Sequence, residues 1–117
     1  LLEHRADVSA KDNDGLSSLH YAAQMGRKGV TRLLLENRAD VLGKTDFGAT
    51  PMHYAAGEDH GDVVLLLREH GADPLATDVD GETPLHWAAR QGRKEATRLL
   101  VAVGSDDLSR TDAGMTP

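Results

Sequence analysis

The sequence contains no cysteine and no isoleucine, and only four of its 117 residues are aromatic. Without cysteine the chain can form neither a disulfide framework nor a thiolate metal site. No uninterrupted apolar run approaches the roughly 20 residues that cross a bilayer. Lysine and arginine number 13 against 19 acidic residues, and the resulting net charge of −6 argues against non-specific nucleic-acid binding.

The apolar residues that are present point to a core of closely packed helices. Leucine supplies 16 of them and alanine 15, whereas valine supplies eight. Leucine and alanine favour helices, and the small alanine side chain lets two helices approach closely, whereas a sheet needs more β-branched residues. The length suits one domain, which would bury about two-thirds of its unfolded surface.

The strongest pattern is a repeat with a period of 33 residues. Several residue types hold this spacing over three or more periods: Gly15, Gly48, Gly81 and Gly114; His20, His53 and His86; the alanine pairs at 22–23, 55–56 and 88–89; and Asp7, Asp40, Asp73 and Asp106. Self-similarity of this kind indicates stacked units that share one continuous core.

Each period predicts two short helices and a polar loop. In the middle repeat, Thr50 and Pro51 predict the start of the first helix, because threonine caps a helix and proline suits its first position. Apolar residues at helical spacing over 63–67 predict the second helix. Gly71 then offers the left-handed residue with which many helices end.

These motifs resemble those of ankyrin repeats. The heptad at 83–89 reads Thr-Pro-Leu-His-Trp-Ala-Ala, the one at 50–56 reads Thr-Pro-Met-His-Tyr-Ala-Ala, and Gly-Ala-Asp stands at 71–73. The resemblance covers essentially the whole chain. It implies an all-α solenoid of stacked helix-turn-helix units, with β-hairpin or loop tips that project between the repeats.

The register divides the single domain at 1–117 into successive units. We expect a partial repeat at 1–11, full repeats at 12–44, 45–77 and 78–110, and the start of a further repeat at 111–117. The chain is therefore expected to be a segment of a longer stack.

Two positions depart from the family pattern. Arg38 stands where Gly71 ends the next second helix, and Asp59 stands where Gly26 separates the first two helices. A side chain at either position must accept a left-handed backbone or distort the turn.

The periodic histidines do not predict a metal site. His20, His53 and His86 belong to successive repeats, about 10 Å apart, so their rings cannot converge on one zinc ion. We expect them to bond capping hydroxyls and the backbone, and we expect His60 to face solvent. The sequence has no nucleophile elbow and no phosphate-binding glycine motif, so it predicts neither catalysis nor a cofactor.

Two other groups of side chains favour a structural interpretation. Tyr21, Tyr54 and Trp87 recur once per repeat, and we expect them to pack beside the alanines with their polar ends available to a ligand. Basic residues cluster over 27–32 and 93–98 at the second helices. We expect these clusters to be a solvated convex face.

The tips and the ends of the first helices vary between repeats while the scaffold stays constant. Apolar side chains among acidic ones occur there, and protein-binding surfaces combine such anchors with a polar rim. The candidate partner-binding residues are Asp14, Leu16, Met25, Asp46, Phe47, Tyr54, Val79, Asp80, Glu82, Trp87, Arg90 and Met115.

The sequence thus predicts a non-catalytic protein–protein interaction module whose concave face and tips bind a basic partner with apolar anchors. Two alternatives stay open. One is a stack that senses a nucleotide or another small molecule around Tyr54, Trp87 and Arg90, and the other is a spacer array that positions domains elsewhere in a longer protein. We expect a monomer located inside the cell, in the cytoplasm or nucleus, with no metal, nucleic-acid or membrane partner.

Overall fold

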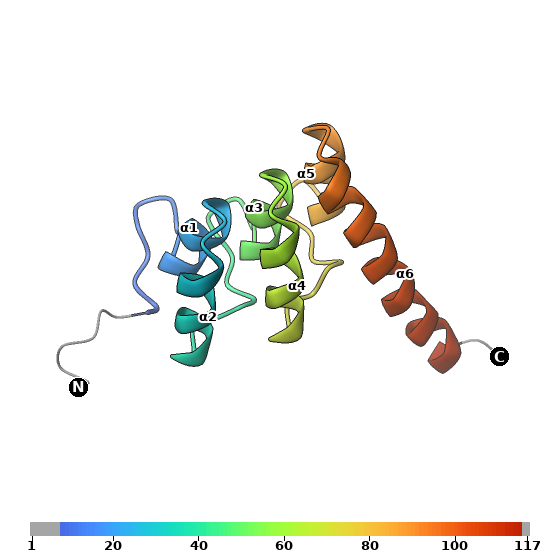
Figure 1. The fold of residues 1–117 in the computed structure, drawn as a ribbon, viewed down its shortest axis with the longest axis horizontal. Helices are drawn as coiled ribbons and strands as arrows, with labels where there is room; N and C mark the ends of the chain where they lie inside the picture. Colours follow the sequence, from blue (N-terminus) through green and yellow to red (C-terminus); the bar gives the residue numbers. More distant parts are fainter. Residues whose placement is uncertain (1–7, 116–117) are drawn as a thin grey trace.

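A computed structural model describes the backbone of residues 8–115 and the side chains of residues 8–104. This part of the chain contains six helices and no strand. The helices are α1 (Ser18–Gln24), α2 (Lys28–Glu36), α3 (Pro51–Gly57), α4 (Gly61–Glu69), α5 (Pro84–Arg90) and α6 (Lys94–Met115) (Figure 1).

Each first helix begins with a capping box, at the positions predicted from the sequence. The Thr50 hydroxyl accepts a hydrogen bond from the N–H of His53 at 3.4 Å, and His53 Nδ1 accepts one from the N–H of Thr50 at 3.0 Å. Ser17 and Thr83 form the same reciprocal pair with the histidine three residues later. The capping box therefore pairs two backbone N–H groups at the start of each first helix.

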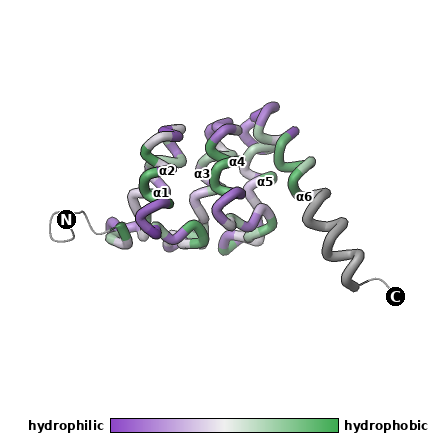
Figure 2. The backbone as a smooth tube through the Cα atoms, turned by 60° about the horizontal axis from the view of Figure 1, so that its bottom comes forward, coloured by the Kyte–Doolittle hydropathy of each residue, from purple (hydrophilic) through white to green (hydrophobic). Residues whose placement is uncertain are grey.

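The first helices and the second helices form two layers along the stack (Figure 1). α1 packs against α3 and α3 against α5, while α4 lies between α2 and α6 in the other layer. Ala23, Ala55 and Ala88 are fully buried, as close helix contacts require, and so is Leu67 of α4. Figure 2 shows the apolar stretches of the second helices within the stack. The predicted all-α solenoid is confirmed.

The two predicted left-handed positions are confirmed. Arg38 has a φ of 69° and Asp59 a φ of 64°. After α2 and α4, the N–H groups of Ala39 and Ala72 each donate to the carbonyl five residues earlier, at 3.0 Å. This hydrogen bond ends each of the two second helices, and the alanine side chain that follows the helix is buried.

The last second helix differs from the prediction. Gly104 stands in register with Gly71, but it lacks a positive φ, and α6 continues to Met115. Ser105 replaces the alanine whose buried methyl group closes α2 and α4, so the apolar contact that favours the turn is missing. Met115 therefore ends a helix, where the sequence predicted a tip. Its side chain lies outside the described residues, as do residues 1–7 of the predicted partial repeat at 1–11 and residues 116–117 of the predicted further repeat at 111–117.

Candidate interaction surface

Each tip is a loop that folds back on the side chain of its first residue. In the first repeat, Asp12 Oδ1 accepts hydrogen bonds from the N–H groups of Asp14 and Leu16, both at 2.9 Å. Asp12 Oδ2 accepts another from the hydroxyl of Tyr21 on α1. The Tyr21 bond is the main cause that lowers the pKa of Asp12 below its ordinary value. The tip is thus tied both to itself and to the first helix.

The same arrangement recurs in the third repeat. Asp78 Oδ1 accepts from the N–H groups of Asp80 and Glu82 at 2.9 Å, and Oδ2 accepts from the indole N–H of Trp87 at 3.0 Å. Burial acts to raise the pKa of Asp78, but the bonds from Glu82, Trp87 and Asp80 outweigh it and lower the pKa. In the second repeat a threonine takes this position. We name the three equivalent side chains the brace residues: Asp12, Thr45 and Asp78.

The brace role of Asp12 and Asp78 was not predicted from the sequence. A signal for it does exist in the sequence. In each repeat, a side chain with an acceptor oxygen stands nine residues before the periodic aromatic residue. Two acids therefore belong to the scaffold rather than to the rim of a binding surface: Asp12 and Asp78.

Main-chain hydrogen bonds join neighbouring tips. The N–H of Asp46 donates to the carbonyl of Asp14 at 3.0 Å, and the N–H of Val79 donates to the carbonyl of Phe47 at 2.8 Å. Gly48 permits this approach, because it has a φ of 78° and a Cβ there would stand 3.0 Å from the nitrogen of Val79. The tips therefore form one continuous row, built from loops.

The row of tips carries two of the most exposed apolar side chains in the described residues. Phe47 is 64% exposed and Val79 is 67% exposed, and their main chains are in direct contact. Leu16 on the first tip is only partly exposed, and Met25, at the end of α1, is 59% exposed. The structure therefore brings Phe47 and Val79 together, whereas Met25 lies at the C-terminal end of α1.

The charged candidates fall into two groups. Asp14, Asp46 and Asp80 are exposed, and their carboxylates have no ion pair within the part of the chain that the structure describes. Glu82 instead forms an ion pair with Arg90, at 2.5 Å between Oε1 and the guanidinium. Only the first group leaves negative charge open to a partner.

The aromatic ladder packs between repeats, as expected. The rings of Tyr54 and Trp87 meet edge to face with centroids 5.3 Å apart, and Trp87 also lies 5.1 Å from the ring of His53. Burial raises the pKa of Tyr54. The indole N–H of Trp87 is occupied by Asp78. The polar end of Trp87 thus has a partner within its own tip, contrary to the expectation that it is available to a ligand.

The two buried histidines link repeats, which confirms the predicted structural role. His20 Nε2 bonds the carbonyl of Gly43 at 2.9 Å, and His53 Nε2 bonds the carbonyl of Glu82 at 2.9 Å. Burial lowers the pKa of both imidazoles, because the charged form would be desolvated. Each ring therefore acts as a neutral bridge between its own helix cap and the next repeat.

The expectation that His60 faces solvent is wrong. Its Nε2 donates to the carbonyl of Gln24 in the preceding repeat at 3.0 Å. At the equivalent position one repeat later, the guanidinium Nε of Arg93 donates to the carbonyl of Gly57 at 3.0 Å. These side chains satisfy the carbonyls at the ends of first helices, where intrahelical donors run out.

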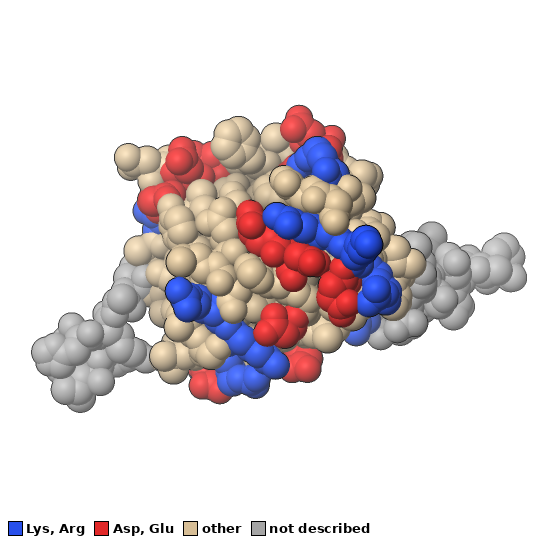
Figure 3. Space-filling view, turned by 45° about the horizontal axis from the view of Figure 1, so that its top comes forward, with Lys and Arg blue, Asp and Glu red and all other residues tan. Residues whose placement is uncertain are grey.

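Among the described residues, the basic cluster at 93–98 is paired with acidic side chains. Arg98 pairs with Glu95 at 2.6 Å, and Arg93 approaches Glu58 at 3.8 Å. In the view of Figure 3, basic and acidic side chains lie side by side. Exposed pairs of this kind contribute little to stability, and they leave little net field for a polyanion.

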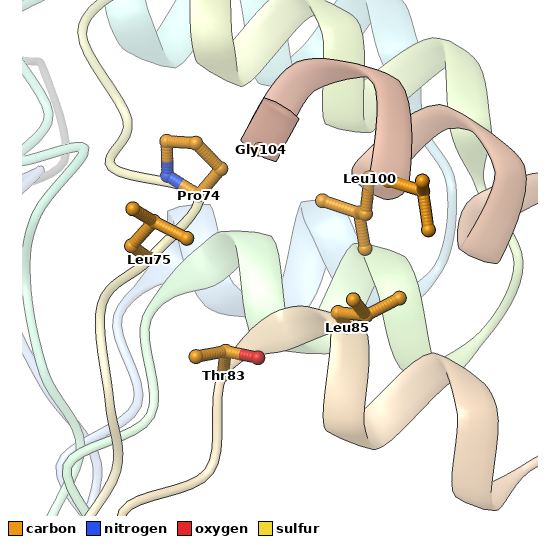
Figure 4. Close-up of a pocket in the computed structure, with 7 residues that line it drawn as sticks. Pro74, Leu75, Thr83, Leu85, Leu100 and Gly104 are labelled. Carbon is orange, nitrogen blue, oxygen red and sulfur yellow. The ribbon is translucent and has the colours of Figure 1, made fainter. Parts of the chain in front are cut away.

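An apolar hollow of about 170 Å³ opens between the loop after α4 and the helices α5 and α6 (Figure 4). Met52, the equivalent of Leu85 one repeat earlier, is fully buried, whereas Leu85 is partly exposed here. The hollow contains none of the candidate residues and no charged side chain. Its lining consists of Pro74, Leu75, Thr83, Leu85, Leu100, Val101 and Gly104.

Among the described residues, no group of three or more His, Cys, Asp or Glu side chains is arranged to hold a metal ion. Within the same part of the chain, no helix combines the length and the apolar character that a membrane crossing needs.

Comparison with known families supports the motif resemblance. A family model described as ankyrin repeats in three copies matches residues 1–78. A second model, described as ankyrin repeats in many copies, matches residues 58–101. No curated protein matches the sequence.

Proposed function

Because the chain belongs to the ankyrin-repeat family, whose members are generally protein–protein interaction modules, we propose that its tips and first helices bind a protein partner. A fold alone never specifies a function, so the proposal depends on the surface that this chain presents. The residues that vary between repeats supply that surface.

The observation that carries the proposal is the pair Phe47 and Val79. Both side chains are about two-thirds exposed on adjoining tips whose main chains are hydrogen bonded. Their exposure contributes nothing to the packing of the stack, and the scaffold bonds at these positions come from the backbone. Exposed apolar side chains on a rigid, polar-rimmed frame are typical anchors of a protein interface.

The charges around this pair support a basic partner. Asp14, Asp46 and Asp80 carry free carboxylates on the same row of tips, and Glu82 is balanced by Arg90. Opposite charges across an interface accelerate encounter and exclude wrong partners more than they add affinity. We therefore assign anchoring to Phe47 and Val79, and steering to the three acids.

The two alternatives have less support. A small-molecule site around Tyr54, Trp87 and Arg90 would need the polar groups of Trp87 and Arg90, which already bind Asp78 and Glu82. A spacer array does not require exposed apolar side chains such as Phe47 and Val79. Our proposal therefore includes a monomer without catalytic activity, working inside the cell as ankyrin repeats commonly do.

A displayed library of random 12-residue peptides tests the partner's chemistry. We expect selection on the immobilised protein to enrich Lys or Arg beside aromatic or aliphatic residues. A parallel selection on the Asp46→Lys, Asp80→Lys variant should lose the basic residues and keep the apolar ones. Enrichment of acidic peptides, or identical peptides from both selections, would contradict the proposal. A thermal-shift screen with nucleotides tests the alternative, because a ligand that binds only the folded stack raises its melting temperature.

A further inference from the structure

One turn between a first and a second helix carries a side chain where the other two turns have glycine. Gly26 follows α1 with a φ of 69° and Gly92 follows α5 with a φ of 71°, whereas Asp59 follows α3 with a φ of 64°. A left-handed backbone strains any residue with a Cβ, although aspartate tolerates it better than most. Contacts elsewhere in the structure must therefore hold Asp59 in this conformation.

The carboxylate of Asp59 reaches into the next repeat. Its Oδ1 accepts a hydrogen bond from the N–H of Ala96 at 2.9 Å. Ala96 is the third residue of α6, and the N–H groups of a first helical turn have no carbonyl partner four residues earlier within the helix. An ionised acceptor makes such a bond shorter and stronger, and a negative charge is favourable at a helix N-terminus. Asp59 therefore caps the second helix of the following repeat.

The junction between the first two repeats is built differently at this point. The N–H of Val63, the third residue of α4, donates to groups of its own repeat, at 2.8 and 3.1 Å. A Cβ at Gly26 would stand 2.6 Å from the ring of His60, so this junction has no room for an aspartate. Arg93 replaces His60 one repeat later, and the ring that excludes a side chain is therefore absent beside Asp59.

The Asp59 bond lies at the opposite end of the first helices from the tips, because each tip precedes a first helix and Asp59 follows α3. At the tip end, the N–H of Val79 donates to the carbonyl of Phe47 at 2.8 Å. At the other end, Asp59 bonds α6 and Arg93 Nε donates to the carbonyl of Gly57. Hydrogen bonds at both ends resist a rotation between the two repeats that bonds at one end alone would permit.

We propose that Asp59 is a positioning residue, whose bond to the first turn of α6 fixes the third repeat on the middle repeat and so fixes Val79 relative to Phe47. This inference rests on the proposed function, in which these two side chains are the anchors. Anchors that already stand in their bound geometry lose less conformational freedom when a partner binds.

Amide hydrogen exchange, resolved by NMR on the whole chain, tests the bond without a partner. Asp59→Gly removes the carboxylate and keeps the left-handed turn, so the Ala96 amide should exchange on the order of tenfold faster relative to the Val63 amide. Asp59→Asn keeps an acceptor oxygen and should restore most of the protection. Glu58→Gln, on the same turn, is the matched control and should leave the ratio unchanged. An unchanged ratio in Asp59→Gly would overturn the inference.

Residual dipolar couplings measure the positioning itself. The backbone amides of α3 and α5 should fit one common alignment tensor in the wild-type protein and in Asp59→Asn. In Asp59→Gly, the couplings of α5 should be reduced relative to those of α3, because the third repeat gains motion of its own. Full couplings and one common tensor in Asp59→Gly would show that the third repeat is held without Asp59, which would overturn the positioning role.

A peptide from the library selection separates this inference from the proposed function. Asp59→Gly leaves Phe47 and Val79 in place, yet it should weaken peptide binding about threefold or more, whereas Asp59→Asn should bind as the wild type does. Unchanged affinity in Asp59→Gly would overturn the positioning role while supporting the binding surface. If no peptide binds the wild-type protein but exchange and couplings follow the expected order, the proposed function fails and the Asp59 bond between repeats stands.

Discussion

Replacing His53 by alanine should destabilise the protein far more than replacing His86, although both occupy the same position of the same motif. His53 is fully buried, and its two ring nitrogens join the cap of α3 to the carbonyl of Glu82 in the next repeat. His86 makes the same bond to the N–H of Thr83 at 2.9 Å, but the residue is exposed.

The expected magnitudes follow from what each substitution leaves behind. His53→Ala leaves the buried N–H of Thr50 without its partner, removes one of the two hydrogen bonds at the carbonyl of Glu82, and opens a cavity between two repeats. The unpaired N–H costs about 1–3 kcal/mol and the lost bond to Glu82 about 1 kcal/mol, and the cavity adds to this, so we expect a loss of about 3–5 kcal/mol. His86→Ala removes a contact that water can replace, at a cost of about 1 kcal/mol.

Urea unfolding followed by circular dichroism measures both variants. If His53→Ala is unfolded in buffer, refolding it with trimethylamine N-oxide places its free energy on the same scale. Equal losses for the two variants would refute the reasoning, because they would show that burial and the inter-repeat bond add nothing to the motif.

Three other perturbations have expected outcomes. Burial lowers the pKa of His20 and His53 in the folded protein, so below the ordinary histidine pKa of 6.5 the unfolded chain binds more protons than the folded one. The free energy of unfolding should therefore have its full value above pH 6.5 and decline as the pH falls, which urea titrations from pH 8 to 5 can follow. Gly15→Ala should lower the urea midpoint more than Gly81→Ala, since both need a left-handed backbone but only at Gly15 would the new Cβ meet Asp46, at 2.8 Å. Asp46→Lys with Asp80→Lys should slow peptide association and weaken its salt dependence in stopped-flow measurements, and unchanged rates would contradict the steering role.

Most of the fold could be predicted because the same capping and turn positions recur in each repeat. Thr50 and Thr83 begin helices where capping chemistry requires it, and Arg38 and Asp59 adopt the left-handed backbone that glycine adopts elsewhere. The end of α6 could not be predicted in this way. A glycine permits a left-handed turn but does not compel one, and Gly104 lacks the buried alanine that follows Gly71.

The surface could be predicted only by residue type. Exposure of Phe47 and Val79 follows from their places in the tips, but residue type alone does not tell which acids are free. Asp12 and Asp14 are the same residue type on one tip, and only the nine-residue spacing to Tyr21 distinguishes the acid that braces the loop from the one that faces solvent. His60 shows the same limit, since its carbonyl partner lies 36 residues away in another repeat.

The most direct test of the binding surface compares affinities of one selected peptide for matched variants. Burying an apolar side chain contributes about 1.5–3 kcal/mol, so Phe47→Ala with Val79→Ala should weaken binding about 30-fold or more. Arg32→Ala with Arg98→Ala, on the second helices, should leave the Kd within about twofold by isothermal titration calorimetry, since exposed charges away from the contact add little. Loss of binding in the second pair with retention in the first would contradict the account.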